Sequence, residues 1–288
     1  MTQILITSAN GTVGTATIRA LRAAGVAVRA GLRSPEKGQA LAELGAEVVR
    51  WDYTAPETMR SALADIDRLF LVTPWVPEMT DLVAAAVQAA NQAGVKFVLR
   101  SSGAGANPDA PVALPRQHGI GERLVRESGI PAAVIRPTFF MDNLINYAGA
   151  TIRVEGAFYG AANDGKVAYI SSRDIGRVAA AILQEPAEHQ GKLYELTGPQ
   201  ALTEAEAAER LAAALGKPVK YVNLTPDQLA GGLRSHGVPD FMVEGLVFLE
   251  SVKAQGWAAQ VSPAVAQITG RPAESLSDFL RREAQRLA

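Results

Sequence analysis

Up to Ile135 the chain alternates short, almost wholly apolar runs with longer segments whose apolar residues recur at helical spacing. This alternation is typical of repeated βαβ units that build a parallel sheet. Strands are expected at residues 3–6, 26–32, 47–50, 68–72, 96–100 and 132–135, and helices at residues 12–24, 35–44, 56–64, 77–92 and 114–127. Because strands that are apolar on both faces need helices on both sides, the pattern predicts a doubly wound α/β fold with a parallel Rossmann sheet.

Capping signals support these helix boundaries. A left-handed residue that ends a helix is expected at four glycines just past helical segments, Gly25, Gly45, Gly94 and Gly129. The run from Thr54 to Glu57 has the pattern of a capping box, with Pro56 at the start of the helix. Local sequence and periodicity therefore predict the same elements.

The pattern loosens after Pro137. A Gly-rich stretch is followed by an expected strand at 167–170, a helix at 173–184 and a strand at 193–196. Helical spacing then recurs from Thr203, where the run to Glu206 is a second capping box, and from Thr225, Val238 and Ser275. We expect residues 1–137 to form the main domain and residues 138–288 a smaller, mostly helical lobe. Its strands return to the main sheet, so the lobe is not an independent fold.

The composition excludes several classes of function. The 288 residues carry 28 Lys and Arg against 29 Asp and Glu, and they include no cysteine, which rules out disulfides, thiolate nucleophiles and Cys-ligated metal. A net charge of −1 lacks the basic footprint of a nucleic-acid binder. No apolar run approaches the roughly 18 residues of a membrane-spanning helix, and Met1 leads into a strand rather than a signal peptide. We expect a cytoplasmic protein with neither nucleic acid nor membrane as a partner.

The first strand leads into a helix through a glycine-containing turn, which is where a parallel fold binds the phosphates of a dinucleotide. Gly11 lets the backbone approach the pyrophosphate, Gly14 lets helix and strand pack closely, and the helix N-terminus supplies N–H groups. Ser8 stands where the usual motif has its first glycine, so this tight turn must form with a side chain present. The predicted phosphate-binding residues are Thr7, Ser8, Asn10, Gly11, Thr12, Val13 and Gly14.

The end of the second strand distinguishes NAD from NADP. An acidic residue there bonds the ribose 2′-hydroxyl of NAD, whereas an arginine accommodates the 2′-phosphate of NADP. This chain has Arg33 followed by Ser34 and, three residues later, Lys37, which favours NADP(H) over NAD(H). The alternative is that Arg33 is a solvated loop residue, and Glu36 adds a nearby negative charge.

Later strands end in residues that suit the rest of the cofactor. Asp52 either bonds the adenine amino group or caps its own turn, and Tyr53 packs against the adenine. Ligands collect at the carboxyl ends of parallel strands. This places Ser101 among the cofactor-binding residues and the nicotinamide between Thr73 and Pro74 on one side and Pro137 and Phe140 on the other.

Five runs together resemble the NmrA-like branch of the atypical short-chain dehydrogenases. They are residues 7–14, 33–37, 136–143, 173–175 and 194–199, and the resemblance extends from Gln3 to about Tyr221. Within that branch the chain is similar to bacterial NADPH-dependent quinone oxidoreductases and triphenylmethane dye reductases. The resemblance implies an NADPH-dependent reductase with a Rossmann domain at residues 1–137 and a substrate-binding lobe at residues 138–288.

The usual Tyr-x-x-x-Lys pair of the superfamily is absent, because none of the six tyrosines has a lysine four residues later. At the corresponding place stands His118-x-x-x-Glu122, which resembles the quinone and dye reductases. In related isoflavone-reductase-like enzymes a catalytic lysine aligns with His118. On one helix face, Glu122 could orient the imidazole and favour its protonated form, making His118 the first candidate for proton donor. Alternatively, His118 only binds substrate and the proton comes from water.

Scattered aromatic and large apolar residues suggest a flat apolar substrate site beside the nicotinamide. The candidates for this lining are Trp75, Phe139, Phe140, Met141, Phe158, Phe241, Phe248 and Trp257. The residues predicted to bind substrate are Trp75, His118, Phe139, Phe140 and Phe241. For any single one, core packing is the alternative. Asp174 is expected to be structural, at the start of its helix. Without closely spaced ligands no metal site is expected.

Two functions of different class follow. One is a reductase that delivers hydride from NADPH to a small hydrophobic quinone-like, aromatic or ketone substrate and exists as a monomer or homodimer. The other is a non-catalytic redox sensor of the NmrA type, which the missing Tyr-x-x-x-Lys pair favours. The aromatic candidates and His118 favour the enzyme. An epimerase is a weaker third alternative, because such enzymes usually keep the tyrosine.

Overall fold

A computed structural model describes residues 3–287 of the chain. The chain divides into two compact units, each described here by itself. The first, called the sheet unit, comprises the residues up to Pro137 together with Ser172–Glu195. The second unit comprises Thr138–Ser171 and the residues from Leu196 onward.

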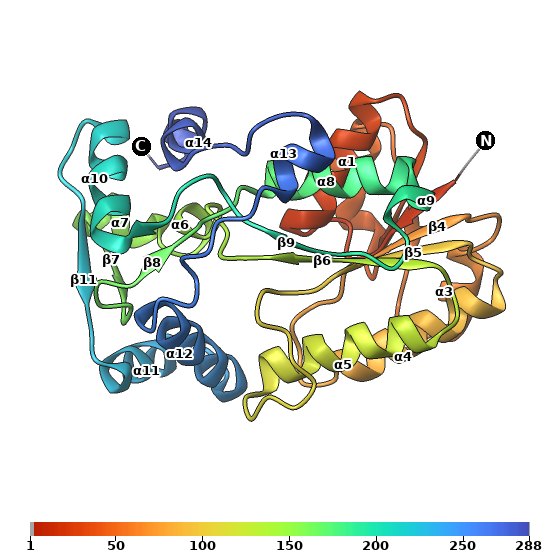
Figure 1. Ribbon diagram of the computed structural model, residues 1–288, viewed down its shortest axis with the longest axis horizontal. Coiled ribbons are helices and arrows are strands. Elements are labelled where there is room, and N and C mark those ends of the chain that lie inside the picture. Colours follow the sequence, from red (N-terminus) through yellow and green to blue (C-terminus); the bar gives the residue numbers. More distant parts are fainter. Residues whose placement is uncertain (1–2, 288) are drawn as a thin grey trace. The chain divides into compact units, whose positions relative to one another are not determined.

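A seven-stranded sheet forms the centre of the sheet unit (Figure 1). Its strands are β1 (Ile4–Ile6), β2 (Val28–Leu32), β3 (Glu47–Arg50), β4 (Arg68–Leu71), β5 (Phe97–Ser101), β6 (Ala132–Pro137) and β9 (Leu193–Leu196). They lie in the order β3-β2-β1-β4-β5-β6-β9, and each neighbouring pair from β3 to β6 is parallel. Because the chain direction across the sheet reverses between β1 and β4, the topological switch point lies there. The predicted doubly wound fold is confirmed.

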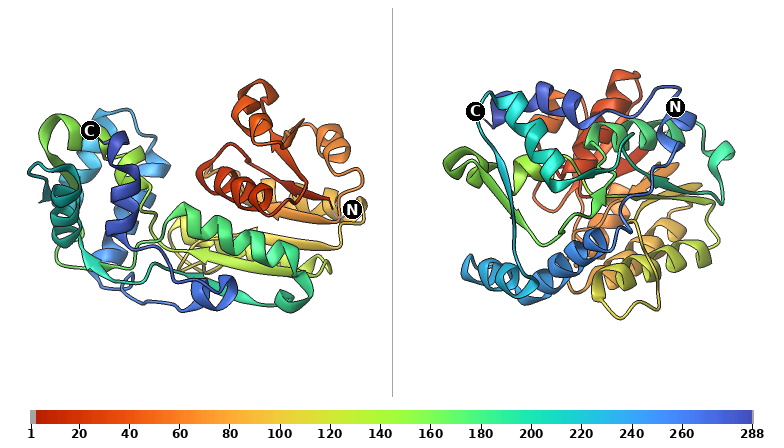
Figure 2. Two further views of the ribbon diagram at one scale, coloured as in Figure 1. Left: turned by 90° about the horizontal axis from the view of Figure 1, so that it is seen from above. Right: turned by 60° about the vertical axis from the view of Figure 1, so that its left-hand side comes forward.

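Helices cover both faces of this sheet (Figures 1 and 2). On one face lie α1 (Thr12–Ala23) and α8 (Ser172–Gln184), and on the other lie α3 (Pro56–Ala62), α4 (Met79–Gln92) and α5 (Ala113–Glu127). A Cβ on Gly176 would lie 2.5 Å from the carbonyl carbon of Ala16, so α8 packs against α1 at its backbone. The core beneath α3, α4 and α5 is built from buried apolar residues that include Trp51, Leu63, Leu69 and Val83.

Most predicted elements are present within a few residues of their expected bounds, and the four capping glycines have φ between 73° and 82°. Two details differ. The segment 35–44 is a 3-10 helix (Pro35–Gly38) followed by α2 (Gln39–Glu43), and Gly38 packs so closely that a Cβ would lie 2.7 Å from Val48 Cγ1. The capping box predicted at Thr54 is wrong, because its hydroxyl donates to Asp52 Oδ1 at 2.7 Å instead of capping α3.

The second unit combines short strands with helices. Strand β7 (Ala157–Gly160) pairs in parallel with β11 (Lys220–Asn223), and β8 (Lys166–Val167) pairs antiparallel with β10 (Leu202–Thr203). Its helices are α6 (Asn143–Asn146), α7 (Gly149–Glu155), α10 (Glu204–Leu215), α11 (Pro226–Ser235), α12 (Asp240–Ala254), α13 (Ala264–Thr269) and α14 (Leu276–Glu283), while α9 (Pro186–His189) belongs to the sheet unit. The predicted capping box at Thr203 is confirmed. The strand expected at 167–170 is reduced to Val167 and an isolated bridge from Ile170 to Phe140.

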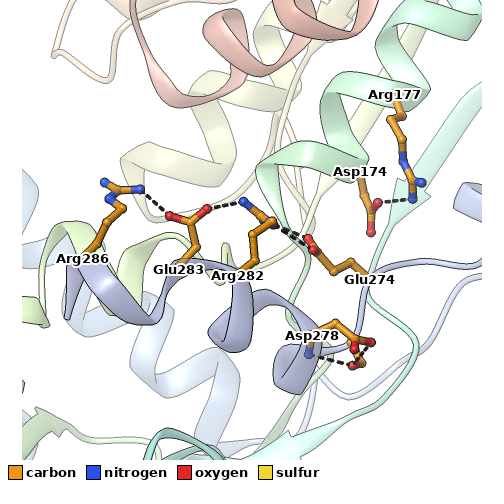
Figure 3. Close-up of polar contacts among 8 residues, drawn as sticks. Asp174, Arg177, Glu274, Asp278, Arg282, Glu283 and Arg286 are labelled. Atoms are coloured by element: carbon orange, nitrogen blue, oxygen red, sulfur yellow. Dashed lines mark hydrogen bonds and ion pairs between the residues drawn. The ribbon is translucent and has the colours of Figure 1, made fainter. Parts of the chain in front are cut away.

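Charged residues near the C-terminus form a chain of ion pairs within the second unit (Figure 3). Arg282 donates to both carboxylate oxygens of Glu274 at 3.1 and 3.0 Å and also pairs with Glu283, which pairs with Arg286. Arg286 in turn donates to the side chain of Asn146 in α6 at 3.2 Å. The chain therefore ties α14 to the segment that follows β6. Over residues 3–287, no helix is long and apolar enough to span a membrane.

Candidate functional site

The turn between β1 and α1 has the geometry that a dinucleotide phosphate site needs. Ser8 has φ +47°, so it occupies the left-handed region that the first motif glycine usually occupies. Its carbonyl accepts the Gly11 N–H at 3.0 Å, which closes the turn. A Cβ on Gly14 would lie 2.7 Å from Ala9 Cα, which confirms the expected close packing of helix on turn. The turn therefore forms as predicted, with the strain placed at Ser8.

The residues around this turn fit a bound dinucleotide. Helix α1 begins after Gly11 with no side-chain cap, which leaves its first turn open to an anion such as a phosphate. A Cβ at Gly11 would already lie 3.2 Å from Ser8 O, and Asn10 beside it is exposed. The Thr7 hydroxyl instead donates to Val72 O at 2.7 Å and joins β1 to the end of β4. Thr7 thus supports the turn through the sheet.

Arg33 lies at the carboxyl end of β2, beside this turn. Its side chain is 83% exposed, and its Nε lies 4.0 Å from Asp52 Oδ2. The Ser34 hydroxyl makes no hydrogen bond within residues 3–287, and Lys37 follows in the 3-10 helix. Arg33, Ser34 and Lys37 therefore offer three donors within five residues of the chain, where the cofactor ribose is expected.

Asp52 caps its own turn, which is one of the two roles left open by the sequence. Its Oδ1 accepts from the backbone N–H of Thr54 at 3.0 Å and from the Thr54 hydroxyl, and these bonds lower the pKa of the Asp52 carboxyl. Tyr53 packs edge-on against Trp51, with ring centroids 5.6 Å apart, and donates to Val72 O at 3.2 Å. Burial raises the pKa of the Tyr53 hydroxyl. The adenine contacts predicted for both residues stay predictions.

A fully buried arginine lies behind Thr73, one of the predicted nicotinamide neighbours. Arg100, at the carboxyl end of β5, has no exposed surface. It donates to Leu71 O at 3.1 Å and to Thr73 Oγ1 at 3.0 Å, while its Nε has no partner within residues 3–287. Burial lowers the pKa of Arg100 to about 10, so the guanidinium stays charged at neutral pH.

Glu122 does not serve His118 as predicted. Its Oε1 accepts from Ser102 Oγ at 2.5 Å and from Arg136 Nε at 2.7 Å, and its Oε2 accepts from Arg136 Nη2 at 2.6 Å. Arg136 also pairs with Glu195 at 3.2 Å, and its bond to Glu122 raises the pKa of the guanidinium. The carboxylate therefore joins α5 to β6 and to the end of β5.

The expectation of a protonated His118 is also wrong. The side chain is half-buried against Gly103, and its Nδ1 is fully buried without a hydrogen-bond partner in residues 3–287. Burial, together with the charges of Arg100 and Arg136, lowers the pKa of His118 to about 3. A neutral imidazole can still donate or accept one hydrogen bond, but it is a poor source of a proton at neutral pH.

The second unit contains most of the predicted substrate-lining residues. Phe139 is half-buried, with the Lys253 ammonium 4.9 Å from its ring centroid, and Phe140 follows it in the bridge to Ile170. Lys253 is held by Glu204 at 2.8 Å and Glu250 at 2.6 Å. Phe241 lies in the first turn of α12 and is also half-buried.

Three further candidates for the substrate lining, Met141, Phe158 and Trp257, are either buried in a core or largely exposed. Met141 and Phe158 are 1% and 4% exposed in the core of the second unit, so core packing, the alternative reading, holds for them. Trp257 is 66% exposed. In the sheet unit, Asp174 is fully buried in the first turn of α8 and pairs with Arg177, in keeping with its expected structural role (Figure 3).

Comparisons with known proteins give the family. A model of the NmrA-like family matches residues 1–274. The chain is 38% identical over 281 residues to the NAD(P)H azoreductase of Xenophilus azovorans, with 98% of each chain covered. This chain belongs to the NmrA-like family. The crystal structure of the NADPH-dependent quinone oxidoreductase of Escherichia coli in complex with NADPH matches at TM-score 0.86 and 31% identity, covering 97% and 99% of the two chains. The triphenylmethane reductase of Citrobacter sp. matches at TM-score 0.86 and 26% identity, covering 98% and 99%.

Within this NmrA-like chain, sequence reasoning missed Arg100 and the Ser102–Glu122–Arg136 network. Arg100 lies at the end of the strand expected at residues 96–100, and a charged residue after Phe97, Val98 and Leu99 is itself a signal. The network joins residues from three elements, and its 20-residue and 14-residue separations leave no local pattern.

Proposed function

We propose that the chain is an NADPH-dependent oxidoreductase that delivers hydride to a hydrophobic quinone-like, aromatic or ketone substrate. The relatives named above include an NAD(P)H azoreductase, a quinone oxidoreductase and a triphenylmethane reductase, each matched over nearly the whole chain. Their substrates differ, but all are conjugated molecules that accept a hydride or two electrons. The enzyme class is therefore an NAD(P)H-dependent reductase, and the substrate within that class is a planar, electron-poor molecule.

The observation that carries this proposal is the turn after β1. It combines Ser8 in the left-handed region, close packing at Gly14 and an uncapped helix N-terminus, which together suit a pyrophosphate. Beside it, Arg33, Ser34 and Lys37 offer donors for a 2′-phosphate, which supports a preference for NADP(H) over NAD(H).

The remaining predicted residues have roles that their geometry permits. Bound NADPH supplies the hydride. Thr73 and Pro74 at the end of β4 hold the reacting ring in place, and neutral His118 donates a hydrogen bond that orients a substrate oxygen or nitrogen. Phe139, Phe140, Phe241 and Trp75 exclude water from the substrate. The product takes its proton from water, because His118 has a pKa of about 3 and is a poor source of a proton at neutral pH.

The experiment is to follow the absorbance of NADPH and NADH with purified protein and a panel of quinones, azo dyes, triphenylmethane dyes and polyaromatic ketones. Direct cofactor titration accompanies it. We expect substrate-dependent oxidation of NADPH, with NADH a poorer donor. Cofactor binding without oxidation across the panel would contradict the reductase and favour a redox sensor.

A further inference from the structure

Arg100 is a buried charge that the proposed function has not yet used. Its side chain has no contact with solvent, and it donates hydrogen bonds to an uncharged carbonyl and an uncharged hydroxyl, those of Leu71 and Thr73. Its Nε faces the helix α5, where a Cβ on Gly121 would lie 3.6 Å away, and it bonds to nothing within residues 3–287.

No ion pair balances this charge directly. No carboxylate of residues 3–287 lies within ion-pair distance of Arg100, and the carboxylate that acts on it electrostatically is Glu122. Glu122 bonds to Arg136 through both oxygens, and Arg136 also pairs with Glu195, so Arg100 has no carboxylate of its own. A methionine is shorter and lacks these donors, but it would occupy the aliphatic part of the space without the penalty of burying a charge. The hydrogen bonds to Leu71 and Thr73 require donors but no positive charge, so the fold alone does not explain the charge of Arg100.

The position of Arg100 in the sheet suggests what the charge acts on. The guanidinium lies between the carboxyl ends of β4 and β5, next to the switch point at which Thr7 joins β1 to Val72. Ligands of doubly wound sheets bind in the crevice outside these strand ends. Arg100 donates to Thr73, which follows β4 at this edge of the sheet.

We propose that Arg100 is a positioning residue whose charge stabilises the negative charge that the substrate acquires when it accepts hydride. In this step a C–H bond of NADPH breaks, its electron pair and hydrogen pass to the quinone, NADP⁺ forms, and the substrate becomes a hydroquinone monoanion that then takes a proton from water. The inference rests on the proposed function. A fixed charge in a site without water acts strongly on such a developing charge. It would stabilise the anion in place of the tyrosine of the Tyr-x-x-x-Lys pair, which this chain lacks.

The first test is a substrate series. Arg100→Met, Arg100→Lys and a control, Arg68→Met, are compared with quinones whose hydroquinones differ in acidity. Arg68 starts β4, at the opposite end of the strand from Thr73, and also donates to main-chain carbonyls, those of Leu183 and Gln184. We expect Arg100→Met to lower kcat about tenfold for quinones that give the most basic monoanions and much less for those that give weakly basic ones. Arg100→Lys restores most of the loss, and the control changes no selectivity.

A uniform loss for all quinones, or the same selectivity in the control, would overturn the proposal. If the wild-type protein oxidises NADPH with no quinone, the proposed function itself fails, which is a separate result.

A second measurement uses the wild-type protein and does not depend on turnover or on a variant that folds. 4-Nitrophenol, whose anion resembles the hydroquinone monoanion and is coloured, is titrated with pH in the presence of protein saturated with NADPH, whose nicotinamide is neutral. We expect the bound phenol to ionise about one unit below the free phenol, because the buried positive charge of Arg100 favours the anion. Failure to bind the anion, or ionisation at or above the free value, would overturn the proposal.

Discussion

Buried His118 makes the folding stability of the sheet unit sensitive to acid, and replacing it should remove that sensitivity. The pKa of His118 falls from an ordinary 6.5 to about 3 on folding, because burial and two guanidinium groups disfavour the imidazolium. Below about pH 6.5 the unfolded chain therefore binds a proton at His118, whereas the folded chain does not bind one until the pH approaches 3. Stability is fully present above that pH and is lost as the pH falls towards the folded pKa.

The magnitude follows from the two pKa values. At about pH 5 the linkage relation gives a loss of about 2 kcal/mol relative to neutral pH, and partial exposure of the side chain reduces this to about 1 to 2 kcal/mol. Urea unfolding of the cofactor-free protein at about pH 7.5 and about pH 5 measures it. We expect His118→Gln to lose about 1 to 2 kcal/mol less than the wild-type protein over this interval. His236→Gln, a control at an exposed histidine, behaves like the wild type. Equal acid sensitivity of His118→Gln and wild type would refute the reasoning.

Three further predictions concern the turn, the buried network and the cofactor. Ser8→Gly should not destabilise the protein and should raise the thermal midpoint by up to a few degrees, because it removes about 1 kcal/mol of left-handed strain; a fall in midpoint below that of Ser8→Ala would contradict this. Glu122→Gln should cost about 3 kcal/mol in urea unfolding, since it leaves the half-buried Arg136 guanidinium without its main partner, and a cost below about 1 kcal/mol would show that the pair is dispensable. Arg33→Ala should weaken NADPH binding about tenfold or more in a fluorescence titration and leave NADH binding unchanged, whereas equal effects on both cofactors would remove the 2′-phosphate role.

Features set by neighbouring residues were predictable. The helix ends at Gly25 and Gly94, the capping box at Thr203 and the close packing at Gly14 all depend on residues a few positions apart, and the structure has each of them. Even the consequence of the missing glycine was foreseeable, since the turn conformation is required whatever residue occupies position 8. Ser8 accordingly takes the left-handed conformation.

Features that depend on distant partners were not predictable. Helical spacing places Glu122 one turn from His118, but a free carboxylate pairs with the strongest donors that the fold brings to it. Those donors are Arg136 from β6 and Ser102 from the end of β5, and neither is marked by local sequence. Without that carboxylate, burial and the charges of Arg100 and Arg136 lower the pKa of His118 instead of raising it. Thr54 failed as a cap for a local reason, because Asp52, two residues away, accepts its hydroxyl.

The most direct test of the central claim is an anaerobic reaction of limiting NADPH with an excess of a quinone, in which NADP⁺ and hydroquinone are both quantified. The account predicts one hydroquinone for each NADPH consumed, at a rate that increases with protein concentration. NADPH that binds the protein but stays reduced in the presence of every quinone, azo dye and triphenylmethane dye tested would contradict it.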